Sequence, residues 1–245
     1  MSTPVSDVDL FESASGMAAA NNYNDWTYSL LAHLVRGRVL EAGCGVGTFT
    51  QRLAQSSLIQ SLLSIDISGP AVARCQAVVR SPSVEIRQAD VREIAGEFDL
   101  VVCMNVLEHI TDDAAALRHM LSLVRPGGSL FLLVPAHQWL FTSFDAESGH
   151  HRRYNKRLVR QLLDQATGGR TDRLALRQFY FNAVGALGYW AVYKLLRKAP
   201  RAGAGAEIGW FVRSIVPLQR RLEGTAMPFG ISLVTIATKG RPGQP

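Results

Sequence analysis

The amino-acid sequence predicts an α/β protein built on a Rossmann-like, mostly parallel sheet flanked by helices. Short apolar runs typical of strands alternate with segments long enough for helices, which is the pattern of repeated βαβ units. The runs at 98–105 and 128–135 are apolar along most of their length, as expected of strands that are covered on both faces. With 245 residues, 47% of them hydrophobic and 19% charged, the chain is long enough to bury a sizeable core.

Each element is predicted by its own pattern. The strand expected at 38–43 runs into a glycine-rich turn, and those at 61–67 and 83–90 carry an aspartate at or next to their ends. Strands at 98–105 and 128–135 follow, and the stretches between the runs predict helices at 48–55, 69–80, 112–124 and 155–166. The last run, 231–239, is β-branched and bounded by proline and glycine, which predicts a strand that returns to the sheet.

Two regions fall outside this alternation. Residues 1–37 are expected to form an N-terminal helical cap, with Tyr23 on its helix, before the main domain at 38–245. The aromatic, glycine-interrupted segment 179–229 is expected to be a helical lid inserted before the last strand. Its apolar run, 179–196, approaches the length of a membrane span but contains Asn182, two glycines and Lys194, which favours a buried or cap-forming helix. The alternative is peripheral contact with a membrane.

Charge and cysteine content narrow the possible partners and the compartment. The net charge of +6 comes mainly from arginines scattered along the chain, so we expect a solvated surface and no nucleic-acid partner. Three widely spaced cysteines offer neither a disulfide framework nor a CxxC metal pair. Together with an acidic, polar N-terminal segment that is unlike a signal peptide, this predicts a cytoplasmic protein.

A glycine-rich turn lies between the first strand and the first helix of this alternation. Glu41 is followed by Gly43, Gly45 and Gly47, in the pattern E-x-G-x-G-x-G, and a helix is expected from Thr48. Glycines let a ligand approach the backbone, and the helix N-terminus offers free N–H groups. The third glycine comes one residue too early for the G-x-G-x-x-G pattern of a dinucleotide site.

Aspartates follow at the ends of the next two strands. Asp66 closes the second strand, where a carboxylate can accept hydrogen bonds from both hydroxyls of a ribose, and Asp90 closes the third, level with an adenine. Either residue alone could simply cap a turn or a helix. Because the ends of parallel strands share one edge of a sheet, the set predicts a site for an adenosine-containing ligand.

These motifs resemble those of the class I S-adenosylmethionine-dependent methyltransferases. The matching segments are EAGCGVG, Asp66, QADV, FDLVVCMNVLEHI and RPGGSLFLLVP, within residues 20–170. The resemblance implies S-adenosylmethionine as cofactor, S-adenosylhomocysteine as product, and a sheet of seven strands whose last strand is antiparallel. It also implies a set of cofactor-binding residues: Tyr23, Glu41, Gly43, Cys44, Gly45, Asp66, Ile67, Asp90, Val91 and Asn105. A PAH…GHxRRY pattern is similar to a bacterial branch of the family whose substrate is not settled.

The chemistry on the acceptor is expected in the loop after the fifth strand, 135–158, at the sheet edge where open α/β folds bind ligands. Histidine is the side chain best suited to act as a base near neutral pH, which makes His150 and His137 the candidate catalytic residues. The alternative is structural: Arg152, Arg153 and Tyr154 would cap the next helix and leave the histidines solvated or hydrogen-bonded.

A metal site is considered and not expected. Some members of the family are known for an E-x-x-E-H segment that holds a divalent cation with a further histidine. Here Asn105 stands at the first carboxylate position, before Glu108 and His109, and the loss of a charged oxygen weakens such a site.

The sequence therefore predicts a methyltransferase acting on a small molecule, at a hydroxyl or carboxyl oxygen. Aromatic residues in the cap, loop and insertion favour an apolar or aromatic acceptor, unless they only pack the lid: Trp26, Trp139, Phe141, Tyr180, Trp190 and Trp210. The alternatives are N-methylation, a lipid-linked acceptor at a membrane surface, and a non-catalytic regulator or scaffold that keeps the cofactor pocket.

Overall fold

The computed structural model describes residues 21–191, 219–221 and 227–240. The expectations for residues 1–20 and for most of the insertion, including Trp210, lie outside these ranges. Among the described residues, no helix is long and apolar enough to cross a membrane.

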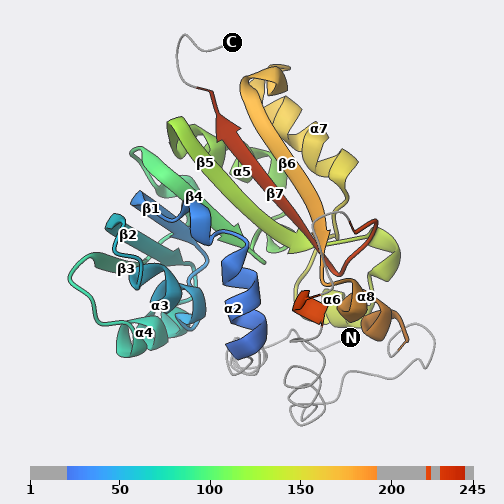
Figure 1. Ribbon diagram of the computed structural model, residues 1–245, viewed down its shortest axis with the longest axis horizontal. Coiled ribbons are helices and arrows are strands. Elements are labelled where there is room, and N and C mark those ends of the chain that lie inside the picture. Colours follow the sequence, from blue (N-terminus) through green and yellow to red (C-terminus); the bar gives the residue numbers. More distant parts are fainter. Residues whose placement is uncertain (1–20, 192–218, 222–226, 241–245) are drawn as a thin grey trace.

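Seven strands form one sheet in the order β3-β2-β1-β4-β5-β7-β6 (Figure 1). Strands β1 to β5 pair in parallel, whereas β7 pairs antiparallel with both β5 and β6. This confirms the Rossmann-like sheet with an antiparallel last strand. The bounds are β1 Gly37–Ala42, β2 Ile59–Asp66, β3 Val84–Gln88, β4 Phe98–Met104, β5 Val124–Pro135, β6 Leu174–Phe181 and β7 Ser232–Lys239.

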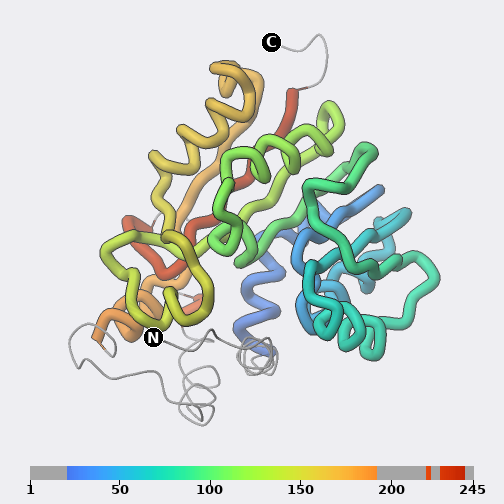
Figure 2. Tube along the Cα trace, turned by 180° about the vertical axis from the view of Figure 1, so that it is seen from behind, coloured from blue at the N-terminus to red at the C-terminus, as the bar shows by residue number. Residues whose placement is uncertain are grey.

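Helices connect the strands and cover both faces of the sheet. The α-helices are α2 Asn21–Ser29, α3 Thr48–Ala54, α4 Gly69–Val78, α5 Asp113–Leu123, α6 Ser143–Glu147, α7 Lys156–Thr167 and α8 Ala183–Tyr189. Short 3-10 turns are η1 Ala32–Leu34, η2 Val91–Glu93, η3 Leu107–His109, η4 Gln138–Leu140 and η5 Thr171–Arg173. Figures 1 and 2 show α2 on one face of the sheet and α5 with α7 on the other.

The core is divided between these two faces because successive strand residues point to opposite sides. Leu40 packs into the cluster that includes Leu117 of α5 and Val159 of α7. Its neighbour Val39 packs into the other cluster, with Trp26 of α2 and Leu53 of α3. Trp26 is only 4% exposed and belongs to the core.

Helix starts follow from local capping. The side chains of Ser68, Asp112 and Asn155 accept hydrogen bonds from backbone amides in the first turns of α4, α5 and α7. Each of these helices begins just beyond the C-terminal end of the preceding strand or its connecting loop. The caps therefore fix where α4, α5 and α7 begin.

Two segments differ from the sequence-based expectation. The sixth strand, β6, extends to Phe181, so 179–181 belong to the sheet and the insertion begins at Asn182, which caps α8 with a φ of +61°. Phe179 and Phe181 pair with β7 and are buried, which explains why this apolar stretch is a strand. The segment 135–158, expected to be a long loop, contains η4 and α6, and it pairs Ala136 with Tyr154 in an isolated bridge.

Candidate functional site

The glycine-rich loop after β1 takes a conformation that glycine allows at low cost. Gly43, Gly45 and Gly47 have φ values of +88°, +49° and +89°. A Cβ atom on Gly43 would lie 2.2 Å from a methyl carbon of Val106, and one on Gly47 would crowd Cys75. A Cβ on Gly45 would meet no atom within 4 Å, so this residue faces open space. The loop thus packs tightly on the protein at Gly43 and Gly47 and leaves room for a ligand at Gly45.

Asp66 ties this loop to the end of β2. Its Oδ2 accepts a 2.9 Å hydrogen bond from the backbone N–H of Gly45, and its Oδ1 accepts one of 2.9 Å from Ser68 N–H. The amides of Gly43 and Cys44 both donate to the carbonyl of Ile65. A carboxylate offers about four lone-pair positions, so Asp66 keeps capacity for a ribose hydroxyl.

Glu41 lies under the loop as a buried, hydrogen-bonded carboxyl group. It is 2% exposed, and its Oε2 accepts from the hydroxyls of Thr50 at 2.6 Å and Ser64 at 2.7 Å. Burial raises the pKa of Glu41 to about 7, although the two hydroxyls oppose the shift. From this position Glu41 braces the start of α3 against β2.

The adenine side of the predicted site is expected at the end of β3, next to the end of β2. Ala89 N–H donates to the carbonyl of Asp66, which places the segment leading to Asp90 beside the ribose acid. The carboxylate of Asp90 is paired with Arg92, which holds the pKa of Asp90 below its ordinary value, and it caps η2 through Arg92 N–H. Ile67 is 72% exposed and offers a free apolar surface, whereas Val91 is buried.

Two further residues of the predicted cofactor set are placed by the structure. Asn105 follows β4 in the left-handed conformation, with a φ of +53°, and it is exposed. Tyr23 is half-buried on α2, with its ring centre 6.0 Å from that of Phe181 and 6.4 Å from that of Trp26. Tyr23 therefore packs against aromatic core residues at the sheet edge.

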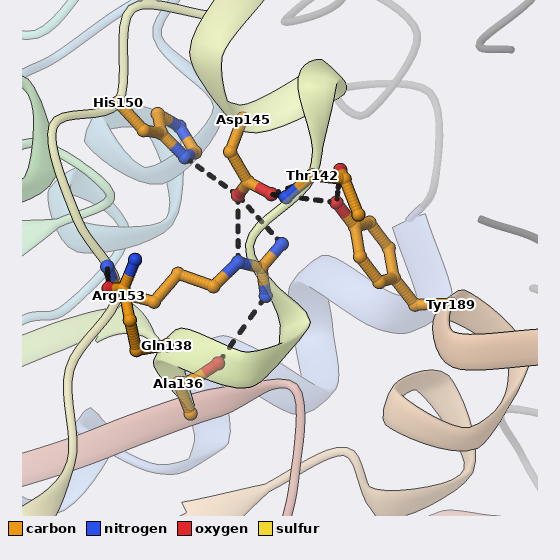
Figure 3. A network of polar contacts seen from close by, with 7 residues as sticks. All are labelled: Ala136, Gln138, Thr142, Asp145, His150, Arg153 and Tyr189. Atoms are coloured by element: carbon orange, nitrogen blue, oxygen red, sulfur yellow. Dashed lines mark hydrogen bonds and ion pairs between the residues drawn. The ribbon is translucent and has the colours of Figure 1, made fainter. Parts of the chain in front are cut away.

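His150 is held by a buried carboxylate. Its Nδ1 lies 3.1 Å from Oδ1 of Asp145, and its side chain is 16% exposed (Figure 3). The ring packs edge-on against His109, at 4.7 Å between ring centres. Asp145 is a site residue that the sequence analysis does not single out. The T-x-x-D capping box at Thr142–Asp145 is the local signal that marks it.

His137 lies in different surroundings. Its ring stacks on Tyr180 at 4.5 Å and lies 5.7 Å from Trp139, while Nε2 is buried and has no hydrogen-bond partner among the described residues. Burial, and then the charge of Arg153, lower the pKa of His137. Its φ of +63° is strained for a histidine. The structure thus places the two candidate bases in separate clusters, one around Tyr180 and the other around His109.

The cluster around His109 also contains Glu108, so that Glu108, His109 and His150 come together. Each offers one ligand atom, and these atoms lie within 4.8 Å of one another. Neither carboxyl oxygen of Glu108 has a hydrogen-bond partner among the described residues, and burial raises its pKa to about 8. Burial of the ring and the neighbouring His150 lower the pKa of His109 to about 4. His150 is therefore a third donor beside the pair considered from the sequence.

Comparison with known proteins assigns the family. A family model described as a methyltransferase domain matches residues 18–174, which is more than half of the chain. The chain therefore belongs to this methyltransferase family, whose cofactor is S-adenosylmethionine.

Individual relatives match over part of their length. A ubiquinone biosynthesis O-methyltransferase of Bordetella avium is 32% identical over 111 residues, which are 44% of this chain and 46% of that protein. One from Xanthomonas campestris is 36% identical over 99 residues, covering 39% of this chain and 41% of the relative. The chain thus matches less than half the length of these curated relatives.

The fold of a solved structure agrees with the assignment. Magnesium protoporphyrin IX methyltransferase from Synechocystis, determined with bound S-adenosylhomocysteine, gives a TM-score of 0.55 at 16% identity. The alignment covers 98% of this chain and 90% of the other. At this level of identity the likeness concerns the fold alone.

Proposed function

We propose that this chain transfers the methyl group of S-adenosylmethionine to an oxygen atom of a small-molecule acceptor. The observation that carries the proposal is the link between Gly45 and Asp66, which joins an open glycine loop to an acid at the next strand end. The names of the curated relatives support oxygen as the acceptor atom.

The residues present fit the cofactor. Gly45 leaves room beside its backbone, Asp66 retains acceptor capacity for ribose hydroxyls, and Ile67 offers an exposed apolar side chain beside the adenine position. Glu41 holds the loop from below through Thr50 and Ser64. When bound, S-adenosylmethionine supplies a methyl group already activated by a sulfonium leaving group. The protein then has to orient the acceptor in line and exclude water.

The acceptor would lie over the ends of β4 and β5, between Asn105 and the histidines. His150 would take the proton of a hydroxyl acceptor, whereas a carboxylate acceptor needs no base at neutral pH. Exposed apolar side chains on η4, on α8 and just after α8 support an apolar or aromatic acceptor: Trp139 at 57%, Leu187 at 54% and Trp190 at 42% exposed. We propose that these three side chains lie at the edge of the site where the acceptor binds.

A bound cation is the second arrangement that a specific observation favours, namely the convergence of Glu108, His109 and His150. These three side chains would hold the ion, which would polarise the acceptor oxygen. The proposed reaction proceeds without it, because Asn105 stands at the first carboxylate position of the E-x-x-E-H segment and adds no charge.

The experiment that tests the proposal uses S-adenosylmethionine labelled in the methyl group, incubated with the protein and a metabolite extract. We expect label in the small-molecule fraction, and none with Asp66→Ala at low cofactor concentration. Alkaline treatment releases labelled methanol from a methyl ester but not from a methyl ether or an N-methyl group, and mass spectrometry separates the latter two. Label in the lipid fraction would indicate a lipid-linked acceptor. Cofactor binding without any transfer would contradict the proposal and favour a regulator or scaffold.

A further inference from the structure

We propose that Asp145 is a positioning residue that fixes His150 in the tautomer with its proton on Nδ1. The lone pair of Nε2 is then left free to accept a proton. The inference deepens the proposed function and rests on it for the use of that lone pair, but the tautomer itself can be measured without any substrate.

Asp145 is a fully buried carboxylate surrounded by donors (Figure 3). Arg153 donates to its Oδ1 through Nε at 2.8 Å and Nη2 at 2.7 Å. Its Oδ2 accepts from Thr142 N–H at 2.9 Å and from the Tyr189 hydroxyl at 2.8 Å. Asp145 itself is 0% exposed, so water does not compete for these positions. The carboxylate is thus held in one orientation.

The protonation state of this carboxylate decides which histidine nitrogen carries the proton. Arg153 donates to Oδ1 through two nitrogens, and Thr142 N–H and the Tyr189 hydroxyl donate to Oδ2, so that this buried carboxyl group is held in its ionised form. An ionised carboxylate only accepts hydrogen bonds. Because His150 Nδ1 lies 3.1 Å from Oδ1, that nitrogen must donate. Nε2, which has no hydrogen-bond partner among the described residues, is then the unprotonated nitrogen of the neutral ring.

Arg153 determines what kind of influence Asp145 has. Its guanidinium compensates the carboxylate charge at Oδ1, the same oxygen that faces His150. Asp145 therefore acts on His150 mainly through hydrogen-bond geometry rather than through its charge. Arg153 also donates from Nη1 to the carbonyl of Ala136, at 3.4 Å, and from its backbone N–H to Gln138. Arg153 therefore connects both ends of the segment 136–153 to the carboxylate of Asp145.

Tyr189 links this arrangement to the helix that opens the insertion. It lies at the end of α8, its hydroxyl contacts Asp145 and, at 2.6 Å, Thr142, and Arg153 lies 4.6 Å over its ring. Figure 1 shows α6 and α8 next to each other at this end of the sheet. Docking of α8 thus completes the set of donors around Asp145, and we infer that it stabilises the His150 tautomer.

The direct test is ¹⁵N NMR of the protein labelled at histidine, with His150 assigned from the spectrum of His150→Gln. At a pH where the ring is neutral, we expect the proton of His150 on Nδ1 in the wild-type protein. Tyr189→Phe removes one donor to Oδ2 and keeps the ring beneath Arg153, so the share of the Nε2–H tautomer should rise in this variant. A wild-type ring with its proton on Nε2 would overturn the proposal, and so would an unchanged tautomer in Tyr189→Phe.

A matched pair of variants tests whether the lone pair is used. An asparagine amide can replace the Nδ1–H donor, whereas a glutamine amide reaches the position of Nε2. We expect His150→Asn to retain the wild-type Tm, and His150→Gln to lower it by about 2–4 °C because Asp145 loses a donor. Both should lower kcat by roughly 10²–10⁴-fold with KM for the cofactor unchanged. Full activity in His150→Asn would show that only the structural contact matters.

The two proposals can fail separately. If methyl transfer is never observed but the NMR spectra show the Nδ1–H tautomer and its sensitivity to Tyr189→Phe, the proposed function fails and the positioning network stands. If transfer is observed with the proton on Nε2, the network proposal fails alone.

Discussion

The backbone N–H of Gly45 donates a 2.9 Å hydrogen bond to Oδ2 of Asp66, and this contact joins the loop after β1 to the end of β2. The two residues are separated by 21 positions in the chain but lie at the same sheet edge because β1 and β2 pair in parallel. The side chain expected to bind the ribose therefore also holds the loop that leaves room for the cofactor.

This double role gives the first prediction. Asp66→Ala should weaken binding of S-adenosylhomocysteine by about 1–3 kcal/mol, because it removes charge-assisted hydrogen bonds and releases Gly45 N–H. Isothermal titration calorimetry measures the change. Glu85→Ala, at an exposed acid on β3, is the control and should bind normally. Equal affinity of Asp66→Ala and wild type would remove Asp66 from the site.

The second prediction compares two glycines in similar backbone conformations. Gly45 has a φ of +49° and Gly168, at the end of α7, a φ of +62°, and neither would place a Cβ within 4 Å of another atom. Alanine at either position should cost roughly 1 kcal/mol of stability through its positive φ. Only Gly45→Ala should also weaken cofactor binding, by tenfold or more, because its Cβ enters the space left beside the loop. Equal affinities in the two variants would contradict a cofactor at this loop.

The sheet, and the gathering of the glycine loop and Asp66 at one of its edges, could be predicted from sequence because their signals are local. Apolar runs, closely spaced glycines and aspartates at strand ends can each be recognised in a few consecutive residues. The resemblance implies seven strands, but the sequence does not show where the sixth lies, because its buried Phe179 and Phe181 run directly into the apolar residues of α8 as one apolar stretch. Pairing with Val234 and Ser232 of β7, more than fifty positions away, determines its structure.

The polar network around Asp145 could not be predicted for a related reason. Tyr189 reaches Asp145 across 44 positions, and Arg153 reaches it from the other end of the segment after β5. No local pattern pairs these residues, although each had been placed in a region expected to be functional. The same holds for His150 and Glu108, whose proximity depends on how the segment 136–153 folds back over η3.

The third prediction concerns the pH dependence of stability. The pKa of Glu108 rises from an ordinary 4.5 to about 8 in the folded protein, because the carboxyl group is buried. The neutral Glu108 carboxyl group therefore contributes its full stabilisation of the folded protein below about pH 4.5. This contribution is lost as the pH rises through 8, where the folded protein must ionise a buried group. Glu108→Gln stays neutral. Relative to wild type it should gain roughly 1–3 kcal/mol in unfolding free energy between pH 4.5 and 9.

Denaturant unfolding at a series of pH values measures this difference. Glu147→Gln, at an exposed acid of the same sheet edge, is the control and should show no comparable pH-dependent gain. A difference between Glu108→Gln and wild type that stays constant from pH 4.5 to 9 would show that Glu108 is ionised in the folded protein throughout.

The fourth prediction is that methyl transfer survives EDTA. Asn105 stands where the metal-binding pattern has its first carboxylate, so the ligand set lacks one charged oxygen. Turnover should stay within about twofold of the untreated enzyme. A large loss that Mg²⁺, Mn²⁺ or Zn²⁺ restores would instead assign Glu108, His109 and His150 as ligands, and calorimetric titration of that metal into the protein would confirm it.

The fifth prediction separates the two candidate bases. His150 is oriented by Asp145 toward the cluster of Glu108 and His109, whereas His137 stacks on Tyr180 with its Nε2 buried. For a hydroxyl acceptor, His150→Ala should lower kcat by roughly 10²–10⁴-fold and leave cofactor affinity nearly intact, because the variant lacks the base held by Asp145. His137→Ala should change turnover far less, since its ring takes part in aromatic packing.

Steady-state kinetics of both variants, with calorimetry for the cofactor, decide between them. Normal turnover in both would mean that proximity alone drives the transfer, as for a carboxylate acceptor that is already ionised, while a loss confined to His137→Ala would reverse the assignment.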